Sequence, residues 1–546
     1  MVEQIEKRSR IIGIAFFLLI LFINPFVLQQ LTRYPFIYSL VFSFLGMCYY
    51  FQIFWLGKKV TASFQYLNSQ NCLWLLVVQS IVFLVFLSIN NCLKWDPNYA
   101  FGGDAPSYIE FDFSSWASIL GNLRTFGLPL IIKSYQLVFK DFQPWPYVQM
   151  ISYVFSIFFL YWCLLSFGFN KIFALLIVSF LLWDKTNFLA FRFIRTESLS
   201  ATFLHLSVGS MLLAIRNWNW KTAVSLGVST FFLYQIRPNL SFIAILVPLW
   251  AVGISVIKEH FHLAQARNIF FRFSQVTILP LFLFCLLRLL VVGQFGVVSM
   301  SGLCLAGHAA HYLNEKSIQY LSGDVRTLAD EILVRKRQLT PPNNLSPFEW
   351  ITFVSEAQKV EMEADAFGAD LTIAWNVAIK QIKGVEPFDD PRLKIEAWKT
   401  NLMELAIFQF HQHNFKIDRL LMRFSIAVLT REWKRYVHWL LGGSFYGMRI
   451  YLESRSFWLI CLGYLVIGKL IFLLLCQRLD GAELKRWNQD IKIFMMMAGS
   501  LYIFGLIPVV VFNYPFLRLL DLIGIYLLPA FLCFSLPPFW LKREAA

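Results

Sequence analysis

Apolar runs of spanning or near-spanning length recur along the whole chain. A transmembrane helix needs about 20 apolar residues to cross a hydrocarbon core of about 30 Å. We find about twelve such runs, centred on residues 11–28, 35–56, 72–91, 147–166, 171–183, 200–215, 222–234, 240–256, 274–293, 457–476, 491–512 and 516–537. Two of them, 171–183 and 222–234, are short for a bilayer and suggest tilted or re-entrant pieces. The pattern predicts an all-α membrane protein with about 12 transmembrane helices, within a range of roughly 10 to 13.

A long polar segment, residues 294–456, separates the last three runs from the others. It holds 18 of the 33 Asp and Glu residues against 19 Lys and Arg, a near-neutral balance typical of a folded soluble domain. A Ser-Pro-Phe-Glu helix-start signature begins at Ser346, and apolar residues at helical spacing over 402–429 predict interfacial helices lying on the membrane. These boundaries give three parts: a transmembrane core, 1–293, with an outer loop, 92–146; a mainly helical extracytoplasmic domain, 294–456; and C-terminal transmembrane helices, 457–546.

Composition and charge agree with a membrane protein. Hydrophobic residues make up 58% of the chain and charged residues only 15%, against about 25% in soluble domains. The net charge of +15 reflects Lys and Arg residues that gather in alternate loops, which the positive-inside rule places in the cytoplasm together with both termini. The charge therefore reports topology, and we expect no nucleic-acid partner. The loop 92–146, the turns at Arg195 and Arg237, and residues 294–456 are then extracytoplasmic.

The first candidate for chemistry is the sequence GGDAPSY in the outer loop. Its glycines allow a ligand to approach the backbone closely, and Asp104 follows them directly. Glu110 and Asp112 come next, at a spacing that puts them on or near the same helical face. A carboxylate in a partly dry pocket is suited to act as a general base toward a hydroxyl group. Alternatively, Asp104 caps the following helix, with Pro106 in its first turn, and the other two carboxylates are solvated.

Two further motifs place cations at the predicted outer ends of spans. In FRFIRTESLSATF, Arg195 and Glu197 lie where the chain re-enters the membrane, and charges at that depth are costly unless they pair or bind a ligand. In YQIRPNLSF, Arg237 precedes a helix-breaking proline. The alternatives are an interfacial ion pair with Thr196 or Ser198 as a helix cap, and a snorkelling arginine.

Other common kinds of site are missing from the sequence. It has no Walker A loop, dinucleotide fingerprint, zincin motif or cysteine-type metal spacing, which argues against a nucleotide-driven pump. His308 and His311 are three residues apart and so share a helical face, where they could bind phosphate or a divalent metal, or lie on an interfacial helix.

Together the three motifs resemble the GT-C class of multi-span glycosyltransferases, which includes the protein O-mannosyltransferases and the aminoarabinose transferase of lipid A. The resemblance covers roughly Ile81 to Val256. It implies an inner-membrane protein of bacteria with a GT-C-like core and an extracytoplasmic active site. The donor would be a polyprenyl-phosphate sugar, the acceptor a glycan, lipid or protein, and the reaction inverting. No cofactor is firmly implied, and a divalent metal stays possible.

The resemblance also implies roles for individual residues. Asp104 would be the general base, with Glu110 and Asp112 as further catalytic candidates. The donor phosphate would be bound by four residues: Arg195, Arg237, Arg288 and His308. Glu197 and Tyr108 would support them.

Two other functions stay open. A multi-span secondary transporter would also have about twelve spans, cytoplasmic termini and broken helices, but it should carry ionisable residues near the midplane and two related halves. A polysaccharide polymerase or ligase would share the lipid-linked chemistry.

Overall fold

The protein is described here by a computed structural model, and its described part is built from helices. The described residues are 69–95, 105–122, 124–182, 190–258, 263–299, 301–338, 377–378, 380–381, 415–437, 440, 489–501 and 504. Within these ranges no strand occurs. The fold is therefore all-α over the described part of the chain, as the apolar pattern predicted.

Five helices in the described residues are long and apolar enough to cross a membrane. They are α5 (Ser69–Ile89), α10 (Trp145–Phe167), α13 (Glu197–Arg216), α15 (Ile243–Lys258) with the 3₁₀ turn η2 (Pro238–Leu240) before it, and α16 (Leu263–Val292). α11 (Lys171–Leu182) and α14 (Trp220–Ile236) come from the two runs that looked short, and both fall short of a full span. The described residues thus show five of the roughly 12 expected spans, and the predicted span 491–512 is described only in part. Four predicted spans lie outside the described residues: 11–28, 35–56, 457–476 and 516–537.

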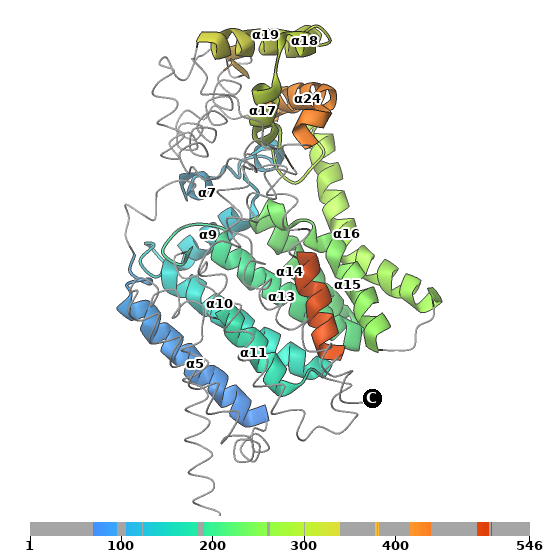
Figure 1. Ribbon diagram of the computed structural model, residues 1–546. Coiled ribbons are helices and arrows are strands. Elements are labelled where there is room, and N and C mark those ends of the chain that lie inside the picture. The colour runs from blue at the N-terminus through green and yellow to red at the C-terminus, as the bar shows by residue number, and fades with distance from the viewer. Residues whose placement is uncertain are drawn as a thin grey trace, which may run out of the picture.

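α13 is the central helix of this bundle. It packs against α10 on one side and α14 on the other (Figure 1). Its small residues let the neighbours approach closely, as is usual between membrane helices. A Cβ atom on Gly209 would lie 2.8 Å from the ring of Phe159 on α10, and the hydroxyl groups of Ser210 and Ser225 are 2.7 Å apart. α5 and α16 lie at the periphery and expose apolar side chains that suit lipid contact.

Basic residues gather at one end of the bundle. Lys258 Nζ, at the end of α15, lies 3.8 Å from the centre of the Phe167 ring at the end of α10. Arg216, at the end of α13, donates to the carbonyl of Ser166. The helical stretch 489–501, drawn in red in Figure 1, packs here too. Arg216 and Lys258 are both predicted to be cytoplasmic, and their contacts with Ser166 and Phe167 place them at a common end.

The opposite end of the bundle carries the short helices of the loop 92–146. They are α7 (Ala105–Ile109), α8 (Trp116–Gly121) and α9 (Gly127–Val138). We call this the outer end, following the charge pattern. The N-terminus of α13 and the C-terminus of α14 are also located here (Figure 1). The outer end therefore brings together segments that are far apart in the sequence.

A second unit of helices stands beyond the outer end of α16 (Figure 1). It contains α17 (Ser301–Tyr312), α18 (Glu315–Ile318), α19 (Gly323–Gln338) and α24 (Phe415–Arg431), and it has a hydrophobic core of its own. α17 and α24 pack so closely that a Cβ atom on Gly302 would lie 2.1 Å from the carbonyl oxygen of Asp418. This unit corresponds to the described part of the predicted extracytoplasmic domain.

The apolar face of α24 is covered by protein, and contact of this stretch with the membrane stays a prediction. We expected the apolar residues over 402–429 to lie on the membrane. In α24 the buried apolar residues, including Leu420 and Phe424, instead share a core with Ala306 and Ala310 of α17. Periodicity shows that one face of a helix is apolar but does not show what covers it. The rest of that stretch and the capping signature at Ser346 lie outside the described residues.

Candidate functional site

The three polar motifs of the sequence meet at the outer end of the bundle. One hydrophobic cluster contains Ala105 and Tyr108 from α7, Ile194 and Leu199 from the second motif, and Ile236 from the third. Trp145 of α10 and Leu128 of α9 complete its centre. Asp104 itself lies outside the described residues, but its neighbour Ala105 is fully buried in this cluster. The described apolar residues of the three motifs thus pack together at this end of the bundle.

Glu197 and Arg237 form an ion pair in this region. Arg237 Nη1 lies 3.6 Å from Glu197 Oε1, and the side chains are 15% and 30% exposed, respectively. Glu197 is the first residue of α13, and Arg237 is the C-cap of α14, immediately before η2. The second carboxylate oxygen, Glu197 Oε2, is buried and has no hydrogen-bond partner among the described residues. A buried oxygen in this state has unused capacity to accept a hydrogen bond.

Two residues of α10 that the sequence analysis missed fix the turn before Glu197. Gln149 is fully buried, and its amide nitrogen donates to the carbonyls of Phe191 and Phe193 at 3.0 Å each. Its amide oxygen accepts the hydroxyl of Ser198, and Trp145 Nε1 also donates to Phe193. The signal that could have revealed Gln149 is a lone amide inside an apolar run, because such groups need a partner in a membrane.

The capping alternative for the second motif is not what the structure has. Thr196 occupies the N-cap position of α13 but makes no capping hydrogen bond through its side chain. The Ser198 hydroxyl is used for Gln149 instead. The alternative of an interfacial ion pair does describe Glu197, although its partner is Arg237 from the third motif.

Arg195 lies on the same turn but points to a different environment. Its side chain is exposed, and its guanidinium carbon stands 4.5 Å from the centre of the Phe193 ring. A guanidinium on an aromatic face keeps its N–H edge available for an anion. Arg195 is therefore an accessible cation on the turn before α13, whereas Arg237 is more buried.

α7 is anchored by a residue that the sequence analysis also missed, Arg124. Its Nε donates to the Ser107 hydroxyl at 3.1 Å, and its guanidinium carbon lies 5.1 Å from the centre of the Tyr108 ring. Tyr108, expected in a supporting role, is buried in the cluster. α7 begins at Ala105 with Pro106 in its first turn, so a helix does follow Asp104 directly. This anchoring fixes the segment that Asp104 precedes.

The two other carboxylates of the loop are exposed. Glu110 lies at the end of α7 and faces solvent. Asp112 accepts the backbone N–H of Ser114 at 2.8 Å. This hydrogen bond, helped by the hydroxyl groups of Ser114 and Ser118, lowers the pKa of Asp112. A lowered pKa makes a carboxylate a weaker base, so Asp112 is poorly suited to take a proton from a hydroxyl group.

Arg288 has surroundings that do not resemble a phosphate site. It is 1% exposed near the outer end of α16, and Nε donates to the Leu120 carbonyl of α8 at 2.8 Å. Nη1 donates to the Gly296 carbonyl at 2.6 Å and Nη2 to the Ser299 hydroxyl at 2.6 Å. Gln294 extends this network to Asp418 of α24. Arg288 thus joins the outer loop, α16 and the second unit. Its predicted binding of the donor phosphate stays a prediction, and these contacts do not favour it.

His308 is also placed away from the other candidates. It is 1% exposed inside the second unit, with its ring centre 5.5 Å from that of Tyr436. Burial, with a smaller contribution from His311, lowers the pKa of His308 to about 3, so the imidazole is neutral near pH 7. A neutral, buried imidazole is a weak anion ligand, and its predicted role toward phosphate stays untested. Among the described residues, no three His, Cys, Asp or Glu side chains gather as a metal site would require.

Comparison with known proteins found no relative of this chain. No protein-family model, no curated protein and no solved structure matches this chain. The residues at the outer end of the bundle are therefore the basis for the proposed function.

Proposed function

We propose that the chain is a membrane glycosyltransferase of GT-C type, which moves a sugar from a polyprenyl-phosphate donor to an acceptor on the extracytoplasmic side. The observation that carries the proposal is the meeting of three polar motifs beside one apolar cluster, with Arg237 and Glu197 paired there. A lipid-linked donor has an apolar chain suited to the bilayer and an anionic phosphate suited to its edge. A site at the ends of spanning helices suits both parts of such a donor.

The proposed topology has about 12 spans, both termini in the cytoplasm, and the site on the outer face of a bacterial inner membrane. The location of the basic residues supports it. Lys258 and Arg216 lie at the end of the bundle opposite the site. The positive-inside rule assigns that end to the cytoplasm.

In the proposed mechanism, Asp104 takes the proton of an acceptor hydroxyl while the oxygen of that hydroxyl bonds to the anomeric carbon of the sugar. The bond between that carbon and the phosphate oxygen breaks, and polyprenyl phosphate leaves with increased negative charge. Arg237 and Arg195 stabilise this charge, because a guanidinium group presents a fork of donors that matches phosphate oxygens. Glu197 holds Arg237 in position. Attack from the side opposite the phosphate inverts the anomeric configuration.

Release of polyprenyl phosphate tests the proposal without knowledge of the acceptor. The purified chain in lipid nanodiscs would receive a panel of polyprenyl-phosphate hexoses and pentoses, with a cell-envelope extract as the source of acceptors. We expect release from at least one donor, and a decrease of about a hundredfold or more in Arg237→Gln, in line with the loss of one charge-stabilising donor.

Arg423→Gln is the matched control for that experiment. Arg423 is an exposed arginine of the second unit, and it pairs with Asp324 at 2.8 Å. It should release polyprenyl phosphate at the wild-type rate. Absence of release from every donor, or an equal loss in both variants, would contradict the proposed function.

One observation favours the transporter as a second candidate. His205 lies near the middle of α13, is buried between helices, and has its Nδ1 3.0 Å from the Ser156 hydroxyl of α10. Ionisable residues at this depth often belong to a transport path. His205→Gln separates the two functions: sugar transfer should persist in this variant, whereas proton-coupled transport should be lost.

A further inference from the structure

A surface of aromatic and cationic side chains lies at the C-terminal end of α24. This aromatic–cationic patch consists of Tyr320, Arg431, Trp433, Lys434 and Arg435. Tyr320 is 63% exposed and Trp433 is 55% exposed. The guanidinium carbon of Arg431 lies 4.3 Å from the centre of the Tyr320 ring, and Lys434 Nζ lies 6.0 Å from the Trp433 ring. Large exposed rings beside cations are typical of binding surfaces, in which Trp, Tyr and Arg are enriched.

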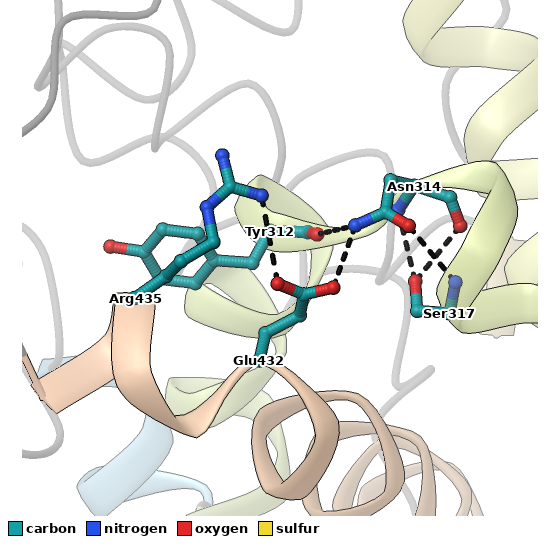
Figure 2. Close-up of polar contacts among 5 residues, drawn as sticks. All are labelled: Tyr312, Asn314, Ser317, Glu432 and Arg435. Carbon is teal, nitrogen blue, oxygen red and sulfur yellow. Dashed lines mark hydrogen bonds and ion pairs between the residues drawn. The ribbon is translucent and has the colours of Figure 1, made fainter.

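Arg435 is held in a fixed orientation, as Figure 2 shows. Its Nη1 lies 3.6 Å from Glu432 Oε2, and its guanidinium carbon lies 5.6 Å from the centre of the Tyr312 ring. Glu432 is held in turn, because Asn314 Nδ2 donates to its Oε1 at 2.7 Å. Asn314 also caps α18 by accepting the backbone N–H of Ser317 at 2.9 Å. A side chain ordered in advance loses less entropy when it binds a ligand.

The patch is remote from the bilayer. Tyr320 lies in the connection between α18 and α19, the helices farthest from the spanning bundle (Figure 1). Arg431 contacts this tyrosine, so the end of α24 shares its location. This location fits a partner from the aqueous side better than lipid headgroups around α5 or α16.

We propose that this patch binds an anionic glycan. A guanidinium group binds carboxylate or phosphate through two parallel hydrogen bonds, and an aromatic ring stacks on the apolar C–H face of a sugar ring. A glycan that carries acidic groups satisfies both features at once. A neutral glycan would leave Arg431 and Lys434, which have no acidic partner among the described residues, without a counter-ion, and a small inorganic anion would leave the rings uncovered. The site is separate from Glu197 and Arg237, so the inference holds whether or not the chain transfers sugars.

The test is binding of polysaccharides to the full-length chain in nanodiscs of uncharged lipid, measured by biolayer interferometry. Polygalacturonate is the anionic probe, and dextran of similar size is the neutral one. We expect polygalacturonate to bind, dextran not to bind, and salt to weaken the binding because it screens exposed charges. The double variant Arg431→Gln/Arg435→Gln should weaken binding at least tenfold, and Trp433→Ala should weaken it severalfold.

Two further variants make the result specific. Arg326→Gln/Arg423→Gln removes the same charge from exposed positions outside the patch and should leave binding unchanged. Arg431→Lys/Arg435→Lys keeps the charge but loses the planar fork, and should weaken binding partly. This variant keeps the test informative if the glutamine variant misfolds. Equal losses in the control double variant, equal binding of dextran, or no binding of polygalacturonate would each overturn the inference. Binding of an acidic protein through the patch, with no glycan bound, would also overturn the inference.

Discussion

Arg237 and Glu197 show how single residues can indicate a site even where their partners are not obvious from the sequence. Glu197 begins the spanning helix α13 and Arg237 directly precedes the span Pro238–Lys258, and a charge there is stable only when it is paired or bound. They lie 40 positions apart in the chain, yet their side chains are 3.6 Å apart. Because one carboxylate oxygen of Glu197 is still without a partner among the described residues, the pair has capacity for a further ligand.

Asp104 is the residue whose replacement tests the mechanism most directly. Asp104→Asn keeps the size of the side chain and removes the proton acceptor, so turnover should fall by about a hundredfold or more with thermal stability nearly unchanged. If Asp104 only caps α7, Asp104→Asn should leave both turnover and stability intact, because Asn caps equally well. Asp104→Ala should then lower the stability by about 1 kcal/mol. Release of polyprenyl phosphate and thermal melting, measured on both variants, distinguish the two roles.

Glu110→Gln and Asp112→Asn are the controls for Asp104. Both carboxylates are exposed, and hydrogen bonds from Ser114 already lower the pKa of Asp112. We expect turnover near the wild-type value in each. A large loss of turnover in either one, with Asp104→Asn active, would transfer the role of base to that residue.

His308 predicts how the second unit responds to acid. Its pKa is about 3 in the folded chain, against an ordinary value of 6.5. The unfolded state therefore binds more protons below pH 6.5, and stability falls as the pH falls through this window, by about 2 kcal/mol at about pH 5. Thermal melting should show this loss in the wild-type chain and not in His308→Gln. His311→Gln, one helical turn away, should keep the acid sensitivity; if it does not, His308 is not the cause.

At the scale of elements, helix contacts set the position of each motif. α9 begins at Gly127, which lies directly against the end of α14. α10 holds the turn before α13 through the hydrogen bonds of Gln149. Neither contact involves a residue proposed for chemistry. The geometry of the site therefore depends on packing between elements that carry no catalytic group.

Gly127→Ala tests this dependence. A Cβ atom there would lie 2.6 Å from both the carbonyl carbon and the oxygen of Gln235, and backbone atoms cannot easily move aside. We expect a loss of about 1 to 3 kcal/mol in stability, as is usual for overpacking, together with weaker transfer because Arg237 follows two residues later. In the control, Gly227→Ala, the nearest atom is Val276 Cγ1 at 3.2 Å, so the effect should be smaller. Equal behaviour of the two variants would argue against a role of this contact.

At the scale of the whole molecule, two helical units are joined through a buried polar network. Arg288 contacts the loop helix α8 and the chain that leads to α17, and Gln294 continues to Asp418 of α24. A guanidinium group that lost these partners inside the protein would be strongly destabilising. The network therefore fixes the described parts of the outer loop and of the second unit at the same end of the bundle.

Cysteine labelling from outside the cell tests which side of the membrane that end occupies. Ser134 of α9 and Thr327 of α19 are exposed, whereas Ser107 is buried and would label poorly. Ser134→Cys and Thr327→Cys should react with an impermeant maleimide in intact spheroplasts, and Asn217→Cys, at the opposite end, should react only after lysis. Four natural cysteines, Cys72, Cys92, Cys163 and Cys285, are buried, which keeps their background labelling low. Labelling of Asn217→Cys in intact spheroplasts would reverse the topology and remove the basis for an extracytoplasmic site.

The sequence by itself determined the properties that depend on local composition. Apolar runs predicted the helices, the lengths of 171–183 and 222–234 predicted the short α11 and α14, and basic loops predicted which helix ends lie together. Length, hydropathy and charge act within about 20 consecutive residues, so a linear pattern records them.

Only the tertiary structure decided which distant groups meet. In the structure, Glu197 pairs with Arg237, and Arg288 donates hydrogen bonds to backbone carbonyls. His308 is buried, and α17 covers the apolar face of α24. The physical reason is that a polar or apolar group shows in the sequence that it needs a partner, but not which partner. Any complementary group at the right depth would satisfy it, and packing of the helices makes that choice.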